Sequence, residues 1–590
     1  MKDWFNKYKF AIALFAIIVV QLGTITYMFA FEKEGFHQDD AWSYQFANGN
    51  YETGMGIATD KDGNFKNANR WVDSELVREY MEVQDGMEFH YDSVLCNMSI
   101  EKNPPLHSIF VHTVCSFFPN TFSWWYAYAV NVLAFIAIMI GLYFFSTDMM
   151  HSRKLALVTC LYYGFTTAAQ NTVLLLRGYA WITAFGVICL CLHSRMYRKR
   201  FQKAVPQLIS IYIVMVLGCL THYSFMMFGF SLTILFGIYL LCRKKWRFAL
   251  IYGGVMALSV ATVFLLWHQA VNLLLAKEPL YGMEMPLWWE IQYCVKTWFS
   301  EVAGIPFQIP DLYIWLYLLL ILFMTAAFMA AAAFVLRKET FFLAFKKKTF
   351  CRLKKNCGKL AHSDKLPLLS FAACFLTLII VAKSCNIFTM GVHSDRYLFF
   401  LMPPLAAILI WGVYRLLKVG LRTKACLYGI FSLILALGMI ENYVEAPPNY
   451  LFERGCDAPT IAERTKGVNV IMIVPDKFHL VYFSPSLLET EHFYVMTAEE
   501  AVESAMVLPA PPDDKPVYLI VSKHRSFLPE DYVRDENVPE GKTPIEEVLS
   551  CGWKVSDLLQ AYSQLNWVTT CTELQEEESF LGKLLVVRLR

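Results

Sequence analysis

Apolar runs of about 20 residues recur along most of this chain, and each is long enough to cross the hydrocarbon core of a bilayer as a helix. Only 17% of the residues are charged, whereas 56% are hydrophobic, which is the composition of a membrane protein. The sequence therefore predicts a polytopic α-helical membrane protein with about 11 transmembrane helices. The expected spans are residues 10–31, 122–145, 155–172, 173–192, 205–220, 224–241, 249–270, 312–336, 366–382, 397–411 and 426–440.

Lysine and arginine gather in every second loop between these runs. Basic groups precede the first run and follow the second, fourth, sixth, eighth and tenth. The positive-inside rule places such loops in the cytoplasm, so we expect a multi-pass plasma-membrane protein with a cytoplasmic amino terminus and an extracytoplasmic carboxyl terminus. The first run is about 20 residues long and no small-x-small cleavage site follows it, so we expect it to stay as an anchor.

Three of the segments expected outside the cytoplasm are too long to be simple turns. Residues 32–121 form the first, and residues 271–311, rich in Trp and Pro, suit an amphipathic interfacial helix. The third is a tail in which "VNVIMIVP", "KPVYLIVSKH" and "LLVVRLR" predict strands and "PIEEVLSCGWKVSDLLQAYSQL" predicts a helix. We therefore expect a transmembrane catalytic domain over residues 1–442 and a small extracytoplasmic α/β domain over residues 443–590. The tail has no Gly-rich phosphate loop or nucleophile elbow, so no chemistry is expected there.

Cysteine usage and charge exclude several classes of function. Most of the 16 cysteines lie inside apolar runs, where a thiol behaves as a small hydrophobe, and no disulfide framework or paired-cysteine metal spacing is readable. The formal net charge is +2, and the basic residues follow the loops rather than one broad surface. No nucleic-acid partner is expected.

Residues that could carry chemistry fall at the outer ends of the expected spans. Taken singly, each has an ordinary structural explanation: an arginine can snorkel, a tyrosine can anchor in the aromatic belt, a histidine can pack, and an aspartate can cap a helix. Taken together, acids, cations and aromatics from separate loops meet on one membrane face, as a site for a lipid-borne phosphate and a polar acceptor requires. The candidates are His37, Asp39 and Asp40 in "HQDDAWSY", the segment "EKNPPLHSIF", Arg177 and Tyr179 in "RGY", His222 in "THY", and Arg396 and Tyr397 in "DRYLFFLMPP".

In this order along the chain, the motifs resemble those of GT-C superfamily membrane glycosyltransferases, and within them the protein O-mannosyltransferase and lipid A aminoarabinose transferase group. The resemblance covers about residues 10–411 and leaves out the tail. Two positions depart from the family pattern. The family pair is usually Asp-Glu where this chain has Asp39 and Asp40, and a histidine often precedes the two prolines where this chain has Asn103.

The resemblance implies a GT-C-like fold and an inverting transfer of a hexosyl or pentosyl group. The donor would be a polyprenyl-phosphate-linked sugar in the membrane lipid, and the acceptor a hydroxyl on a glycan, lipid or protein at the outer face. A carboxylate is ionised at neutral pH and can take the hydroxyl proton, which suits Asp39 as general base with Asp40 beside it. Positive charge suits the phosphate leaving group, so the donor phosphate is expected to bind Arg177, Tyr179, His222, Arg396 and Tyr397.

Some alternatives stay open at this stage. A divalent cation could bind His37 and Asp40 with Asp39 between them, although three candidate ligands within four residues also occur together by chance. A polytopic secondary transporter or flippase for a polar or lipid-linked substrate could use outward acids and cations as substrate sites, and would favour charges at mid-membrane and mirrored halves. A non-catalytic scaffold would explain the tail but not the converging residues.

Overall fold

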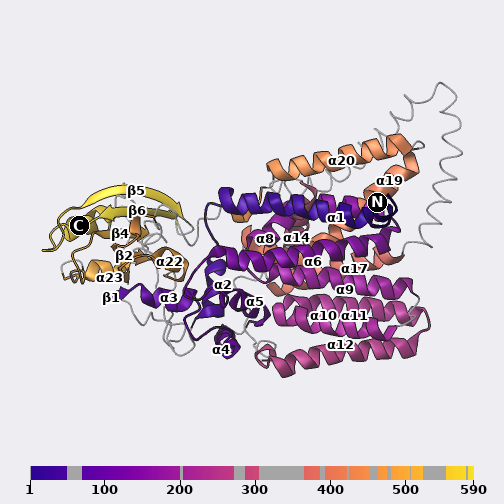
Figure 1. Ribbon diagram of the computed structural model, residues 1–590, viewed down its shortest axis with the longest axis horizontal. Coiled ribbons are helices and arrows are strands. Elements are labelled where there is room, and N and C mark those ends of the chain that lie inside the picture. The colour runs from indigo at the N-terminus through magenta and orange to yellow at the C-terminus, as the bar shows by residue number, and fades with distance from the viewer. Residues whose placement is uncertain are drawn as a thin grey trace.

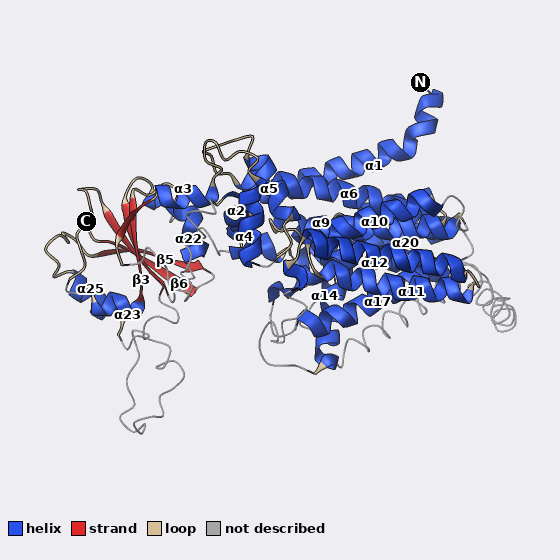
Figure 2. Cartoon of the chain, turned by 90° about the horizontal axis from the view of Figure 1, so that it is seen from below, coloured by secondary structure: helices blue, strands red, loops and turns tan. Residues whose placement is uncertain are grey.

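A bundle of long helices makes up most of the molecule, and a small sheet domain lies beyond one end of it (Figures 1 and 2). The amino terminus lies at the end of the bundle away from the sheet. This computed structural model describes residues 2–49, 69–101, 103–199, 204–271, 286–304, 365–385, 392–421, 424–445, 447–451, 463–474, 480–504, 507–522, 553–579 and 582–590.

Among the described residues, 9 helices are long and apolar enough to cross a membrane, and they match 9 of the expected spans. The expected span at residues 312–336 lies outside the described residues. The matching elements are α1 (Lys2–Tyr27) with the π-helical turn η1 (Met28–Glu32), α6 (Trp124–Met150), α9 (Tyr179–Arg198), α10 (Ala204–Thr221), α11 (Ser224–Cys242), α12 (Trp246–Leu266), α17 (Lys365–Cys385), the 3₁₀-helix η2 (Val392–Leu401) with α19 (Met402–Gly420), and α20 (Lys424–Glu445).

The single helix expected at residues 155–172 is wrong, because the chain forms two shorter helices there, α7 (Arg153–Tyr163) and α8 (Thr167–Leu174). A side chain at Gly164 would overlap the side-chain amide of Gln21 in α1, which would have to move. The Gln21 amide donates to the carbonyls of Cys160 (3.0 Å) and Leu161 (3.1 Å) in the last turn of α7. The two helices still cross the bundle together and end beside the outer loops.

Basic residues of separate loops gather at the amino-terminal end of the bundle. The Arg153 guanidinium lies 5.7 Å from the ring of Phe10 in α1. Arg195 at the end of α9 lies 3.9 Å from Asp148 at the end of α6. Arg153 and Arg195, which follow the second and fourth expected runs, therefore lie at the end of the bundle opposite the sheet domain (Figure 1).

Four short helices between α1 and α6 cover the other end of the bundle: α2 (Gln38–Asn48), α3 (Glu75–Met81), α4 (Tyr91–Glu101) and α5 (Leu106–Cys115). A further helix, α14 (Leu287–Ala303), packs against α17 and α20. It is amphipathic, as expected for the second outer segment, with Cys294 and Glu301 buried and Trp288 and Trp289 exposed.

The sheet domain contains a six-stranded sheet with the strand order β1-β3-β2-β4-β6-β5. The expected strands appear as β2, β4 and β6, and part of the expected helix appears as α25. β2 pairs in parallel with β3 and β4, and the outer strands pair antiparallel. The first strand comes from the first outer loop, so this loop and the tail build the sheet jointly. The elements are β1 (Trp71–Asp73), β2 (Asn469–Val474), α22 (Leu480–Leu487), β3 (His492–Thr497), α23 (Ala498–Glu503), β4 (Val517–Ser522), α25 (Val555–Tyr562), β5 (Thr572–Ser579) and β6 (Gly582–Arg588).

The central strand β2 is buried on both faces, because alternate residues of a strand point to opposite sides. Ile471 and Ile473 pack with Tyr562 of α25 in a core that belongs to the sheet domain alone. Val470 and Met472 face the other way and belong to the main core, which continues into the helical bundle. The sheet is therefore packed onto the helices rather than tethered to them.

Candidate active site

The acid pair lies at the start of α2, where it closes a capping box. The backbone N–H of Asp39 donates to Nδ1 of His37 (3.0 Å), and the backbone N–H of His37 donates to Oδ2 of Asp40 (3.0 Å). The other oxygen of Asp40 accepts the backbone N–H of Leu176 (2.6 Å). Burial raises the pKa of Asp40 to about 7, against the opposing effects of Lys33 and of these backbone hydrogen bonds. Both Asp40 oxygens are therefore used to join α2 to the turn before α9.

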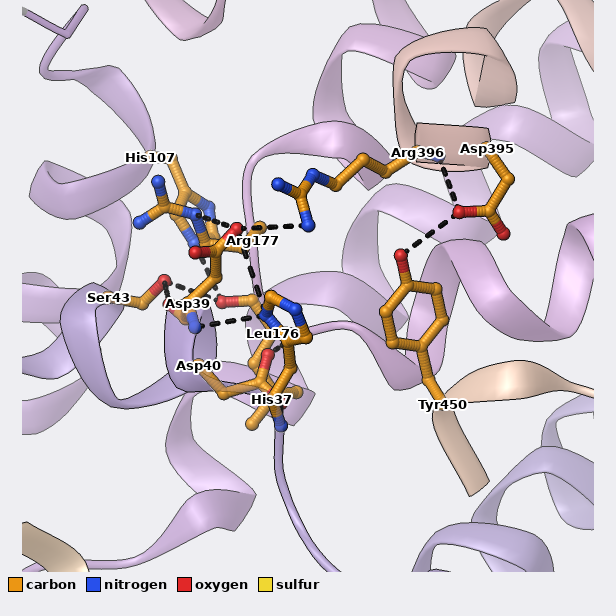
Figure 3. Close-up of polar contacts among 10 residues, drawn as sticks. All are labelled: His37, Asp39, Asp40, Ser43, His107, Leu176, Arg177, Asp395, Arg396 and Tyr450. Atoms are coloured by element: carbon orange, nitrogen blue, oxygen red, sulfur yellow. Dashed lines mark hydrogen bonds and ion pairs between the residues drawn. The ribbon is translucent and has the colours of Figure 1, made fainter. Parts of the chain in front are cut away.

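The Asp39 carboxylate is turned toward two guanidinium groups (Figure 3), and its Oδ2 also lies 3.8 Å from Nδ1 of His37. The same oxygen lies 3.5 Å from Nη1 of Arg396 and 4.0 Å from Nε of Arg177. Only 5% of Asp39 is exposed. The three residues come from α2, from the turn between α8 and α9, and from η2, so the fold brings together charges that are far apart in the sequence. These contacts are ion pairs at distances too long for good hydrogen bonds.

The turn that carries Arg177 is fixed by side chains from three other helices. The Leu176 carbonyl accepts hydrogen bonds from Ser43 Oγ of α2 (2.7 Å) and from Nε2 of His107 of α5 (3.3 Å). Nδ2 of Asn131 in α6 donates to the Leu175 carbonyl (2.7 Å). With the bond to Asp40, these contacts set the direction of the chain at Arg177.

Arg396 lies on η2, a 3₁₀-helix of 10 residues. Runs of this kind are rarely longer than three or four residues, and a 3₁₀ stretch within a helix often marks a functional hinge or a strained sequence. Successive side chains are about a third of a turn apart in this geometry, so Asp395 and Arg396 point to different sides. Among the described residues, the buried Nε of Arg396 has no hydrogen-bond partner. A buried guanidinium nitrogen without an acceptor is costly, so the site is incomplete without a further acceptor.

Aromatic rings border the two arginines. The Tyr179 ring centroid lies 5.1 Å from that of His222 and 5.9 Å from that of Tyr397. Burial, together with Arg177 and Arg396, lowers the pKa of His222 to about 3, so its ring is neutral. Its Nδ1 accepts the backbone N–H of Ser224 (3.2 Å), which places the ring proton on Nε2. His222 can therefore act as a neutral hydrogen-bond donor.

Sequence reasoning gave no role to three residues that the structure places here. Ser43, His107 and Asn131 fix the Leu175–Leu176 backbone. His107 lies within the Pro-Pro motif, and burial and Arg177 lower its pKa to about 3, so it is neutral. Asn131 could have been singled out from the sequence, because a polar amide inside an apolar span is costly without a hydrogen-bond partner.

A cation at His37 and Asp40 would compete with hydrogen bonds that these side chains already accept. Nδ1 of His37 and both oxygens of Asp40 accept backbone N–H groups. Within the described ranges, no three His, Cys, Asp or Glu side chains are grouped as a metal site requires.

Comparison with known proteins was informative at the level of structure. No family model and no curated protein matches the sequence. ArnT from Cupriavidus metallidurans in the apo state matches with a TM-score of 0.50 and 9% identity, over 98% of each chain. The same ArnT bound to undecaprenyl phosphate gives 0.46 and 9%, over 99% of this chain and 98% of that one. The Archaeoglobus fulgidus oligosaccharyltransferase AglB, with an inhibitory peptide and a dolichol-phosphate, gives 0.42 and 10%, over 88% of this chain and 70% of its own. The match to apo ArnT includes the sheet domain, and the protein therefore has the GT-C fold that its motifs predict.

Proposed function

We propose that the protein is an inverting glycosyltransferase, which moves a sugar from a polyprenyl-phosphate donor to an acceptor hydroxyl on the outer face of the plasma membrane. One observation carries the proposal: two partly buried guanidiniums, of Arg396 and Arg177, share the single carboxylate of Asp39 at 3.5 and 4.0 Å. This arrangement leaves one positive charge to be balanced. A polyprenyl-phosphate sugar is a phosphodiester with one negative charge, so it fits the imbalance.

The donor phosphate would take the place that the arginines offer. Its oxygens would accept from Arg177 and from the buried Nε of Arg396, which has no partner among the described residues. His222 would add a neutral N–H, and Tyr179 and Tyr397 would border the sugar. Because the phosphate then engages the guanidiniums, Asp39 would be released from its ion pairs at the moment that it is needed.

The reaction then follows from the positions of these groups. The acceptor hydroxyl attacks the anomeric carbon from the side opposite the phosphate, and its proton passes to the Asp39 carboxylate. The carbon–oxygen bond to the phosphate breaks, and its electron pair leaves with the phosphate. The two arginines stabilise the charge that develops there, so no strong general acid is required. Attack from the far side inverts the anomeric configuration.

The sidedness of the site follows from the distribution of charge. Arg153 and Arg195 lie at the end of the bundle that holds the amino terminus, whereas Asp39 lies at the opposite end near the sheet domain. The positive-inside rule assigns the first end to the cytoplasm and the site and sheet domain to the outside.

The test uses purified full-length protein in detergent, polyprenyl-phosphate sugars with a labelled sugar, and membranes from cells lacking the gene as acceptor source. We expect one sugar type to be consumed, with polyprenyl phosphate released and the label on the acceptor, and no consumption by the Asp39→Asn variant. If no sugar type is consumed above the rate of that variant, the proposal is wrong. Uptake of intact donor by vesicles with the protein would then favour a transporter or flippase.

A further inference from the structure

Tyr450 lies between the segment that leads to Asp39 and the helix that carries Arg396, and the mechanism above gives it no part. It belongs to η3 (Asn449–Leu451), a short 3₁₀-helix near the start of the tail, and its side chain is fully buried. A buried tyrosine hydroxyl is costly unless it finds a hydrogen-bond partner. The contacts of its hydroxyl and of its backbone therefore indicate its role.

The hydroxyl of Tyr450 is bonded to the start of η2. It donates to Oδ1 of Asp395 (3.1 Å), and the same oxygen accepts the backbone N–H of Arg396 (2.8 Å). The other oxygen of Asp395 accepts Nδ2 of Asn171 at a longer distance, 3.4 Å. In Figure 3 the Asp395 carboxyl group is turned toward Tyr450, whereas the Arg396 guanidinium extends toward Asp39. Tyr450 therefore holds the side chain that fixes the backbone from which Arg396 projects.

The backbone of η3 is bonded to the segment that leads into α2. The Tyr450 carbonyl accepts the Lys33 ammonium (2.6 Å), and the Leu451 carbonyl accepts the backbone N–H of Glu34 (2.7 Å). The centroid of the Tyr450 ring lies 6.0 Å from that of His37, the residue that caps α2. One short helix therefore contacts both the segment before Asp39 and the segment of Arg396.

The ring of Tyr450 makes contacts that do not depend on its hydroxyl. Besides His37, it faces Phe399 of η2, with the ring centroids 6.3 Å apart. Phenylalanine at this position would keep both ring contacts and the backbone bonds of η3, and would lose only the bond to Asp395. The effect of the hydroxyl can therefore be measured separately from that of the buried ring.

We infer that Tyr450 is a positioning residue for the transfer reaction: through Asp395 it sets the place of the Arg396 guanidinium relative to Asp39 and to the donor phosphate. The inference deepens the proposed function and rests on the role given there to Arg396. A displacement of about 1 Å in a group that positions substrate can cost up to about a hundredfold in rate. The tail, for which the sequence predicts no chemistry, thereby contributes to the site without touching the substrate.

The first test is donor kinetics of Tyr450→Phe. Its KM for the donor should rise by about threefold or more, but less than in Arg396→Ala, while kcat stays within about twofold of the wild type. Tyr252→Phe is the matched control, because it removes the hydroxyl of an equally buried tyrosine, which lies 3.0 Å from Nε2 of His193 in α9. This control should keep the wild-type KM. A wild-type KM in Tyr450→Phe, or the same rise in both variants, would overturn the inference.

The second test asks whether Tyr450 acts through Arg396. The affinity for unsugared polyprenyl phosphate is measured in the wild type, in Tyr450→Phe, in Arg396→Ala and in the double variant. Tyr450→Phe should lower the affinity by about threefold or more when Arg396 is present, and should have little further effect once Arg396 is removed. An equal loss in both backgrounds would mean a general structural effect, and the inference would be wrong.

A third readout does not depend on transfer. Amide hydrogen exchange in η2 should be faster in Tyr450→Phe than in the wild type and in Tyr252→Phe, because the acceptor of the Arg396 N–H is held less firmly. Faster exchange in a protein whose wild type transfers no sugar would reject the proposed function and keep the link between Tyr450 and η2. Transfer by the wild type, with unchanged exchange and unchanged KM in Tyr450→Phe, would do the reverse.

Discussion

The end of the helical bundle that carries Asp39 and the sheet domain bury different kinds of residue. The core that belongs to the sheet domain alone is apolar, with Ile471, Leu519 and Val587 from three strands. The helical end instead buries Asp39 and Asp40, among other polar side chains. Burying a charged group is costly unless it is paired, so such groups persist where they serve a purpose. The difference supports the proposal that the helices carry the chemistry and the sheet supports them.

The two regions are joined at the element that carries the acid pair. Nε2 of Gln45 in α2 donates to Oγ of Ser484 in α22 (3.1 Å). The Lys33 ammonium donates to the Tyr450 carbonyl (2.6 Å) near the start of the tail. The sheet domain therefore braces α2, and changes in the two regions should have separable effects on turnover and on stability.

The largest expected effect is that of Asp39→Asn. Asparagine keeps the shape of aspartate but cannot take a proton, so turnover should fall by about a hundredfold or more while the protein stays folded. The measurement is the transfer rate, with the melting temperature recorded on the same preparation. Wild-type turnover in this variant would remove Asp39 from the mechanism.

Removal of a guanidinium should come next. Arg396→Ala and Arg177→Ala should each weaken donor use by about tenfold or more, with Arg396 the larger, since it is nearer to Asp39 and more buried. Lysine at either position should rescue only in part, because an ammonium lacks the planar fork of the guanidinium. Donor titrations of kcat/KM check this order. Full activity in both alanine variants would mean that the arginines only snorkel.

Asp40→Asn should affect stability more than turnover. Its amide would face the backbone N–H of His37, so one buried donor loses its acceptor, at a cost of about 1–3 kcal/mol. The raised pKa of Asp40 also makes the wild type lose stability as the pH rises from 3.8 through about 7, and the asparagine variant should lack this slope. Chemical denaturation at several pH values measures both effects. A turnover loss as large as that of Asp39→Asn would contradict the division of roles between the two acids.

The smallest effect on turnover is expected in the sheet. Ile471→Ala truncates a fully buried side chain in the core of the sheet domain and should lower the free energy of unfolding by about 2–5 kcal/mol. The kcat of the folded fraction should stay near the wild-type value, since no residue of this core contacts the site. A strong fall in kcat without loss of folded protein would show that the sheet takes part in the chemistry.

Much of the fold could be predicted, because apolar runs report directly on the environment that each helix must occupy. The prediction of one continuous helix over residues 155–172 was wrong, since the break depends on Gln21 of a distant helix filling the space beside Gly164. The acidic strand β5 was missed for a related reason: "TELQEEES" has low strand propensity and is placed by its partner β6.

The candidate site could likewise be predicted only in part. Asp39, Arg177 and Arg396 could be named from the sequence, because charges at span ends are rare and invite explanation. The positioning roles of Ser43 and His107 could not be, because both depend on hydrogen bonds to the Leu176 carbonyl, far along the chain. Pairings between distant segments set these environments.

The most direct test of the central claim is the binding of unsugared polyprenyl phosphate to purified wild type, Asp39→Asn and Arg396→Ala. If Asp39 and the phosphate share the same two guanidiniums, removing the carboxylate charge should leave phosphate affinity equal to or higher than that of the wild type. Arg396→Ala should lower the affinity by about tenfold or more. A loss of affinity in Asp39→Asn as large as that in Arg396→Ala would contradict the claim that the arginines form the phosphate site and Asp39 the base.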